Sequence, residues 1–273
     1  MNPLPADTPL RGADWIPANR LPNLARIGLR TISDLCHHFP GRHEDRSAFS
    51  RFPEMETDGP VTLCGTLGKI SSRFAGAGRR VIEADLWESE EALLARHIRL
   101  RWFSAHYILK MLCEGDRVVV HGRVRLRGRK PVLEHPDFEV IEESAGPSIH
   151  FGRIVPVHPA GEGISPKALR ALIFTALERV DPGTLRPLLE SGVESAAGDY
   201  HAALRSMHFP DSFEVLAAAR QAVVLEEFFR LQAVLVSRRE EVRSLPGSAK
   251  NSDGGFVESL RAALPFKLTA GQE

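Results

Sequence analysis

Between Pro60 and Glu143 the sequence alternates between apolar and polar residues, in runs that are separated by glycine-containing turns. Alternation with a period of two is typical of strands that bury one face and expose the other. The pattern predicts strands over residues 61–70, 79–87, 96–103, 117–127 and 130–141, with a short helix over 105–112. Three strands, a short helix and two strands is the element order of an OB-fold, so we expect a small five-stranded barrel.

Helical patterns lie on both sides of this segment. Before it, apolar residues at helical spacing predict two short helices around a break at Gly28, the second over 33–39 with Thr31 or Ser33 as its N-cap and Pro40 at its end. After it, Ser165 followed by a proline predicts the start of a further helix.

Two apolar stripes follow Ser165. The first consists of Leu169, Leu172, Ile173, Ala176, Leu177 and Val180. The second lies on a longer helix predicted over 211–242 and includes Leu225, Phe228, Phe229, Leu235 and Val236. Apolar stripes of this period are typical of helices packed on a core, and we interpret both stripes in this way.

The chain therefore belongs to the α+β class and is expected to contain four segments. They are an N-terminal helical segment, the barrel, a helical connecting segment, and a Gly/Ser-rich linker that leads into the start of another domain; they cover residues 1–59, 60–143, 144–245 and 246–273.

Composition excludes several classes of protein. Three cysteines, far apart in the sequence, indicate an intracellular protein without a disulfide framework. No secretory signal and no apolar run of about 18 residues occurs, so we expect a cytoplasmic monomer that does not span a membrane. The histidines at 37, 38 and 43 do not have the spacing of a zinc site, and no metal is expected.

Positive charge gathers in the barrel, although the whole chain has 35 basic and 35 acidic residues. Residues 96–135 contain ten Lys/Arg and three Asp/Glu. Alternation places Ile98, Leu100 and Trp102 on one strand face, and Arg99, Arg101 and Phe103 on the other. The next strand continues the pattern with Arg123, Arg125, Arg127, Arg129 and Lys130.

Arginines beside an aromatic ring suit single-stranded or unpaired nucleic acid, because they neutralise phosphate while rings stack on bases. Tyr107 follows Phe103 by four residues and can project from the same corner of the barrel. Alternating arginines also occur on ordinary solvated strands, and Phe103 or Tyr107 could instead pack in the core.

Sequence motifs for enzymatic catalysis are absent from these 273 residues. There is no nucleophile elbow, no metalloprotease motif and no phosphate-binding loop of the form GxxxxGK[ST]. The nearest string, residues 65–70, is too short and has no hydroxyl to hold magnesium. We therefore expect no catalytic residue here and no ATP hydrolysis by these residues alone.

Short motifs occur in a fixed order along the chain. They are Gly28–Leu35, Phe39–Arg46, Trp102–Tyr107, Glu134–Glu139, Gly152–Val157, Gly163–Ser165, Met207–Pro210, Ala219–Arg220, Glu226–Gln232 and Leu264–Thr269. In these motifs and their order the chain resembles the N-terminal region of RecG-type DNA helicases. The resemblance implies that the barrel is a wedge placed at DNA branch points, and that Phe103 and Tyr107, with Trp102 beside them, lie at the wedge that contacts DNA.

The resemblance also implies an ATP-dependent helicase that acts on replication forks and Holliday junctions in DNA repair and recombination. ATP and Mg²⁺ are expected for the full-length enzyme, whose motor these residues do not include. Gln272 matches a glutamine near the adenine of ATP. Two alternatives stay open: a free-standing OB-fold module for single strands, and an interaction protein that docks through its long helix.

Overall fold

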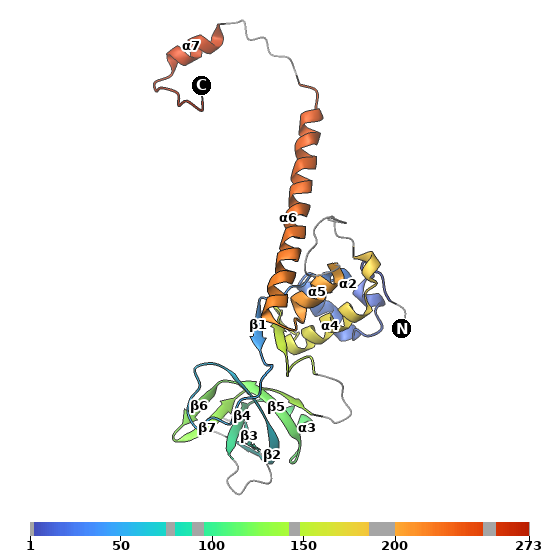
Figure 1. Ribbon diagram of the computed structural model, residues 1–273, viewed down its shortest axis with the longest axis vertical. Coiled ribbons are helices and arrows are strands. Elements are labelled where there is room, and N and C mark those ends of the chain that lie inside the picture. The colour runs from blue at the N-terminus through green and yellow to red at the C-terminus, as the bar shows by residue number, and fades with distance from the viewer. Residues whose placement is uncertain are drawn as a thin grey trace. The chain divides into compact units, whose positions relative to one another are not determined.

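The segment with alternating residues forms one sheet of seven strands in the computed structural model, which describes residues 3–74, 80–88, 96–141, 148–185, 200–247 and 255–272 (Figure 1). The strands are β2 (Val61–Phe74), β3 (Arg80–Trp87), β4 (His97–Phe103), β5 (Arg117–Gly122), β6 (Val124–Arg127), β7 (Lys130–Glu134) and β8 (Asp137–Val140). Their order in the sheet is β6-β7-β4-β3-β2-β5-β8. Neighbouring strands are antiparallel except β4 and β7, which are parallel.

The α+β class is confirmed, and seven strands occur because two predicted strands are each interrupted. Arg123 separates β5 from β6, and His135 with Pro136 separates β7 from β8. The backbone of His135 has a φ of 48°, a left-handed conformation that ends the regular strand. The predicted short helix is a single turn, α3 (Ile108–Met111), and β2 extends four residues beyond its predicted end.

Gly65 on β2 lies close to the backbone at the end of β3. A Cβ atom at this position would stand 2.2 Å from the backbone oxygen of Trp87. Since backbone cannot move aside as a side chain can, we expect Gly65→Ala to lower the free energy of unfolding by about 1–3 kcal/mol. Urea unfolding measures the effect, with Gly59→Ala as the control because no atom lies within 4 Å of its Cβ position. Equal stability of the two variants would contradict this account of β2.

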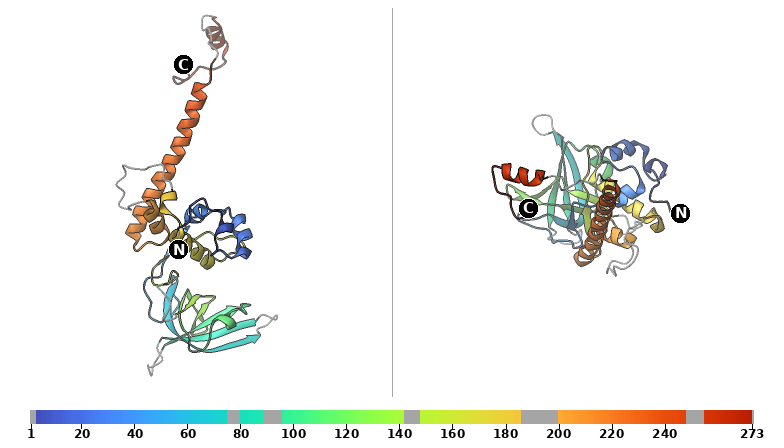
Figure 2. Two further views of the ribbon diagram at one scale, coloured as in Figure 1. Left: turned by 90° about the vertical axis from the view of Figure 1, so that its right-hand side faces the viewer. Right: turned by 90° about the horizontal axis from the view of Figure 1, so that it is seen from above.

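A second buried core, here called the helical base, is built from elements that precede and follow the sheet segment in the chain. Its elements are α1 (Leu21–Arg26), α2 (Ile32–Cys36), β1 (Arg42–Asp45), β9 (Ile154–Val157), α4 (Pro166–Arg179), α5 (Tyr200–His208) and three short 3-10 turns, Leu10–Gly12, Ala18–Arg20 and Pro182–Thr184. One buried cluster joins residues between 6 and 36 to residues between 164 and 223. The blue N-terminal helices and the yellow α4 accordingly lie side by side (Figures 1 and 2).

Local sequence determines the helix starts in the base. Thr31 accepts a hydrogen bond from the backbone of Asp34, whose carboxylate accepts one from the Thr31 backbone in return, so this capping box starts α2 at Ile32. Ser165 caps α4, as predicted. The first predicted apolar stripe is buried along α4, and its interpretation as core packing is confirmed.

The short strands β1 and β9 are not predicted by the sequence pattern. They pair antiparallel, with Arg42 opposite Val157 and Asp45 opposite Ile154. More than a hundred residues separate them, and four residues are too few to show a period. Only the tertiary structure therefore reveals that this pair joins the two halves of the base.

The long helix α6 (Phe213–Ser244) continues for 32 residues across the boundary of two structural units, residues 1–226 and 227–273. Its predicted apolar positions are exposed, with Phe228 at 62% and Leu235 at 53%, so their interpretation as core packing is wrong for the described chain. The second unit also contains α7 (Phe256–Ala263), and most of the predicted linker lies outside the described residues. None of the helices in the described ranges is long and apolar enough to cross a membrane.

Candidate nucleic-acid interface

Strand β4 separates its side chains as the alternation predicts. Ile98 and Leu100 are fully buried, whereas Arg99, Arg101 and Phe103 are partly exposed on the other face. The register pairs Arg99 with Asp85 on β3 and with Val132 on β7. The outer face of β4 is therefore continuous with the outer faces of both neighbouring strands.

Trp102 is a correction to the predicted set of DNA-binding residues. Its side chain is 1% exposed and packs in the sheet core, where its ring meets the ring of Phe138 edge-on. A buried ring has no free face on which a base can stack. Trp102 therefore packs in the core, as its place in the alternation indicates, and its ring is not available for stacking on a base.

The sheet brings the two predicted arginine clusters onto one surface. Arg125 on β6 lies opposite Val132 on β7, which in turn lies opposite Arg99 on β4. Arg127 lies opposite Lys130 across the same β6–β7 hairpin. Residues in direct register point to the same side of a sheet, so strands far apart in the sequence form one outer face, here called the basic face.

Carboxylates that were not considered in the sequence analysis neutralise part of the basic face. Arg99 pairs with Asp85 at 2.9 Å. Arg101 pairs with Glu83 at 2.7 Å. These acidic residues lie on β3, outside the basic stretch of residues 96–135, and the register places them beside the arginines of β4.

Glu83 shows how strongly the arginines act on their partners. Burial alone would raise the pKa of Glu83, but Arg101 and Arg73 outweigh burial and hold that pKa below its ordinary value. Arg127 is likewise paired, with Glu134 at 3.0 Å. These pairs hold their side chains in place, and a phosphate would have to compete with the carboxylates.

The uncompensated positive charge lies at the β6–β7 hairpin. Within the described ranges, no carboxylate pairs with Arg125, Arg129 or Lys130, and all three are exposed. Arg123 donates to the backbone oxygen of Asp58 at 2.5 Å, a contact that leaves its charge uncompensated. This edge of the basic face is the part best suited to attract a polyanion.

Two of the predicted rings lie on the surface near the end of β4. Phe103 is half-buried, and its ring centroid lies 5.5 Å from that of His135. Its backbone N–H donates to Nε2 of His135 at 3.3 Å, which connects the end of β4 to the turn after β7. Tyr107 precedes α3 and is 57% exposed. Both rings are accessible to a ligand.

The remaining predicted residue, Gln272, lies in the second unit and is exposed. Its side-chain oxygen accepts a hydrogen bond from the backbone of Thr269 at 3.0 Å. The structure therefore places Gln272 in a local turn.

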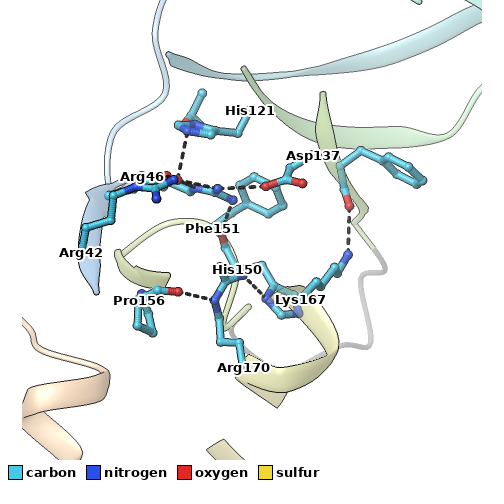
Figure 3. Close-up of polar contacts among 12 residues, drawn as sticks. Arg42, Arg46, His121, Asp137, His150, Phe151, Pro156, Lys167 and Arg170 are labelled. Carbon is cyan, nitrogen blue, oxygen red and sulfur yellow. Dashed lines mark hydrogen bonds and ion pairs between the residues drawn. The ribbon is translucent and has the colours of Figure 1, made fainter. Parts of the chain in front are cut away.

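A buried polar cluster, here called the polar joint, connects the sheet to the helical base (Figure 3). Arg46 follows β1 and is 4% exposed. Its guanidinium donates to Glu44 on β1 at 2.6 Å and to Asp137 on β8 at 2.9 Å, and it lies 5.4 Å from the ring centroid of Phe151. A single arginine thus binds a base strand and a sheet strand together.

Further contacts of the joint cross between the same two parts. His121 on β5 lies 3.5 Å from Glu44 and lowers the pKa of Glu44 most, against the opposing effect of burial. Arg46 and Arg42 lower it further. Lys167 on α4 donates to the backbone oxygen of Phe138 on β8 at 2.9 Å.

Arg170 on α4 completes the joint. It donates to Nδ1 of His150 and to the backbone oxygen of Pro156, both at 2.9 Å. Burial lowers the pKa of Arg170 to about 10 and, with nearby cations such as Lys167, lowers that of His150 to about 3. His150 is therefore a neutral acceptor at neutral pH.

The fold and this surface define a class of protein, a sheet domain on a helical base. The outer face of the sheet combines cations with accessible rings, and surfaces of this composition suit unpaired nucleic acid. Comparison with known proteins gives the particular family. The family model described as the RecG wedge domain matches residues 13–180, and the chain belongs to this family.

Relatives agree with this assignment. The chain is 29% identical to the ATP-dependent DNA helicase RecG of Thermotoga maritima, over 97% of the chain and 33% of that protein. It is 25% identical to RecG of Escherichia coli K12, over 97% and 38%. A solved structure of RecG bound to a three-way DNA junction matches with a TM-score of 0.62 and 25% identity, over 97% and 36%. The chain thus spans about a third of the length of these relatives.

Proposed function

We propose that this chain is the branched-DNA recognition part of an ATP-dependent DNA helicase that remodels stalled replication forks and Holliday junctions in DNA repair and recombination. The observation that carries the proposal is the presence, in one sheet domain, of two accessible rings at the C-terminal end of β4 and uncompensated cations at the β6–β7 hairpin. The relative whose structure contains a three-way DNA junction supports it.

The seven strands fit an OB-fold barrel in which two strands are bent. In this proposal β5 and β6 are the fourth strand and β7 and β8 the fifth. β5 pairs with β2, whereas β6, one residue further along the chain, pairs with β7 at the other end of the sheet order. OB-folds bind oligonucleotides on strands two and three and on the turn between strands four and five. In this protein strands two and three are β3 and β4, and the turn is the β6–β7 hairpin that carries Arg129.

The residues divide by role in this proposal. Phe103 and Tyr107 would stack on bases where the parental strands separate, because rings bind any exposed base. Arg125, Arg129 and Lys130 would contact phosphates and guide the arms of the junction. Arg99, Arg101, Arg123 and Arg127, which already have partners, would contribute secondary phosphate contacts.

ATP and Mg²⁺ would drive the activity of the longer protein, and the absence of a GxxxxGK[ST] loop means that these residues do not by themselves cradle a triphosphate. Gln272 would contact adenine only after leaving its turn with Thr269. We propose that the protein works as a monomer in the cytoplasm.

Binding of the chain to labelled DNA tests the proposal. We expect a replication fork to bind more tightly than matched duplex or single strand, and each ring that stacks on a base to contribute about 5- to 150-fold to fork affinity. The double variant Phe103→Ala, Tyr107→Ala should lose the fork preference. Leu109→Ala, which removes an exposed apolar side chain of α3 two residues after Tyr107, is the matched control and should bind normally.

Two outcomes would contradict the proposal. Equal binding of all three DNAs, unchanged by the double variant, would mean that the sheet is a general polyanion surface. Preference for single strands without preference for forks would indicate a free-standing single-strand-binding module. Measurement at two salt concentrations separates both from protein-docking functions, because contacts to several phosphates weaken steeply with salt.

A further inference from the structure

A third accessible ring lies at the hairpin end of β2. Phe74 is the last residue of β2 and is 71% exposed. Arg80, the first residue of β3, lies opposite it in the sheet, with its guanidinium carbon 4.9 Å from the ring centroid. A cation over one face of a ring holds the ring in place and leaves the other face free for a ligand.

The ring and the cation border one hollow, together with Ser104 and His106 from the turn after β4. The backbone N–H of Ser104 donates to the backbone oxygen of Arg80 at 2.9 Å, which fixes the turn against the hairpin. Ser104 has a φ of 54°, a left-handed conformation that costs energy in a residue with a side chain. The fold thus maintains a strained turn beside the hollow.

Arg80 has capacity for a further partner. Its Nε is buried and has no hydrogen-bond partner among the described residues. Its guanidinium has no carboxylate partner in the same ranges, unlike those of Arg99 and Arg101. A guanidinium without a carboxylate partner beside an exposed ring suits a ligand with both an anionic group and a flat ring.

Phe74 and Phe103 point to opposite sides of the sheet. In the register, Phe103 lies opposite Val81, and Val81 lies opposite Arg73. Phe74 and Arg80 are one residue further along their strands, and successive side chains alternate between faces. The same end of the sheet therefore carries a ring on each face.

We propose that Phe74 and Arg80 form a second nucleotide subsite, in which one unpaired base stacks on the free face of Phe74 while a phosphate binds Arg80. This inference rests on the proposed function. Because the rings of Phe74 and Phe103 lie on opposite faces of the sheet end, each of the two strands that separate at a branch has its own ring and its own cations. The ligand class is single-stranded DNA, bound without regard to sequence.

The test uses the 273-residue chain and two forks, one with both arms single-stranded and one with a single unpaired arm. We expect Phe74→Ala to weaken binding of the two-armed fork by about 5- to 150-fold and Phe74→Trp to retain it. Arg80→Gln should reduce the slope of log affinity against log salt by about 0.7 to 0.9, the value for one phosphate contact.

Phe49→Ala is the matched control. Phe49 is also an exposed phenylalanine, at 52%, but it precedes Ser50, which is bonded to Thr62 near the start of β2. Twelve residues of strand separate Thr62 from Phe74, roughly 40 Å. Since both rings are exposed, neither substitution should change the unfolding midpoint, and Phe49→Ala should bind both forks normally.

The outcomes separate this inference from the proposed function. Normal binding by Phe74→Ala, together with loss of fork preference in the Phe103→Ala, Tyr107→Ala variant, would overturn the second subsite and leave the first proposal intact. Normal binding by both variants would overturn both. Crosslinking of an iododeoxyuridine in one arm to Phe74, and in the other arm to Phe103, would support one strand on each face.

Discussion

Replacement of Arg46 by methionine is expected to lower the free energy of unfolding by about 1.5–3 kcal/mol, because it removes charge-assisted hydrogen bonds from a buried guanidinium to Glu44 and Asp137. Arg46 is 4% exposed and binds Glu44 and Asp137, so its loss removes the link between β1 and β8. Glu44 would keep His121 at 3.5 Å and Arg42, whose side chain is 69% exposed.

Arg42→Met is the matched control for this prediction. Both arginines bind the same carboxylate at similar distances, 2.9 Å for Arg42 and 2.6 Å for Arg46, but only one is buried. Exposed ion pairs contribute about 0–1 kcal/mol, so Arg42→Met should change the free energy of unfolding by no more than that. Urea unfolding at pH 7 gives both values. Similar losses in the two variants would show that burial does not govern the polar joint.

A fall in pH from 7 to 5 is expected to lower the free energy of unfolding by about 2 kcal/mol for each of three buried histidines, or about 6 kcal/mol in all. Burial lowers the pKa of His150 to about 3, of His158 to about 2 and of His208 to about 4. An unfolded histidine has a pKa near 6.5. Below that pH the unfolded chain binds more protons than the fold does, so stability is complete above about pH 6.5 and declines as the pH falls.

Hydrogen bonds explain why His158 and His208 stay neutral. Nε2 of His208 donates to the backbone oxygen of Cys36 at 2.8 Å, so its Nδ1 must accept. His158 therefore donates from Nε2 to that Nδ1 at 2.9 Å. Its own Nδ1 is buried and has no partner among the described residues, so a proton added there would have no acceptor. The pair is compatible with the neutral form of both rings.

Urea unfolding at pH 7, 6 and 5 measures the effect. His158→Gln should reduce the slope of the free energy of unfolding against pH at pH 5 by the equivalent of about one bound proton. This holds even if the substitution lowers stability at every pH. His106→Gln is the control, since His106 is exposed and should leave the dependence unchanged. A free energy of unfolding that does not vary between pH 7 and 5 would contradict the buried, neutral state of these histidines.

Strands with one buried face could be predicted because their period is visible within a few residues. The alternation on β4 identified its buried and outer residues correctly, and the stripe of α4 was likewise recognised. Trp102 was placed in the core by the same alternation, and its inclusion among DNA-binding residues came from its position in a motif. The local pattern was the better guide, because burial follows the period of the strand.

The apolar positions of α6 were interpreted wrongly for a related reason. A helical stripe shows which face is apolar but does not show what covers it. Phe228 and Leu235 are exposed in the described chain. Phe74 was not among the predicted residues because it lies beyond the predicted end of its strand. There the sequence does not show whether a ring contacts a cation on the neighbouring strand.

The sequence by itself determined the α+β class, the order of the main strands and helices of the sheet segment, the capped start of α4, and the concentration of arginines in the sheet segment. Each of these depends on residues close together in the chain. Only the tertiary structure decided which arginines keep a free charge, because the carboxylates that neutralise Arg99, Arg101 and Arg127 come from other strands. It also decided that β1 pairs with β9 and that Arg46 joins the base to the sheet. Contacts between residues so far apart in the chain depend on packing, and no periodic pattern in the local sequence indicates them.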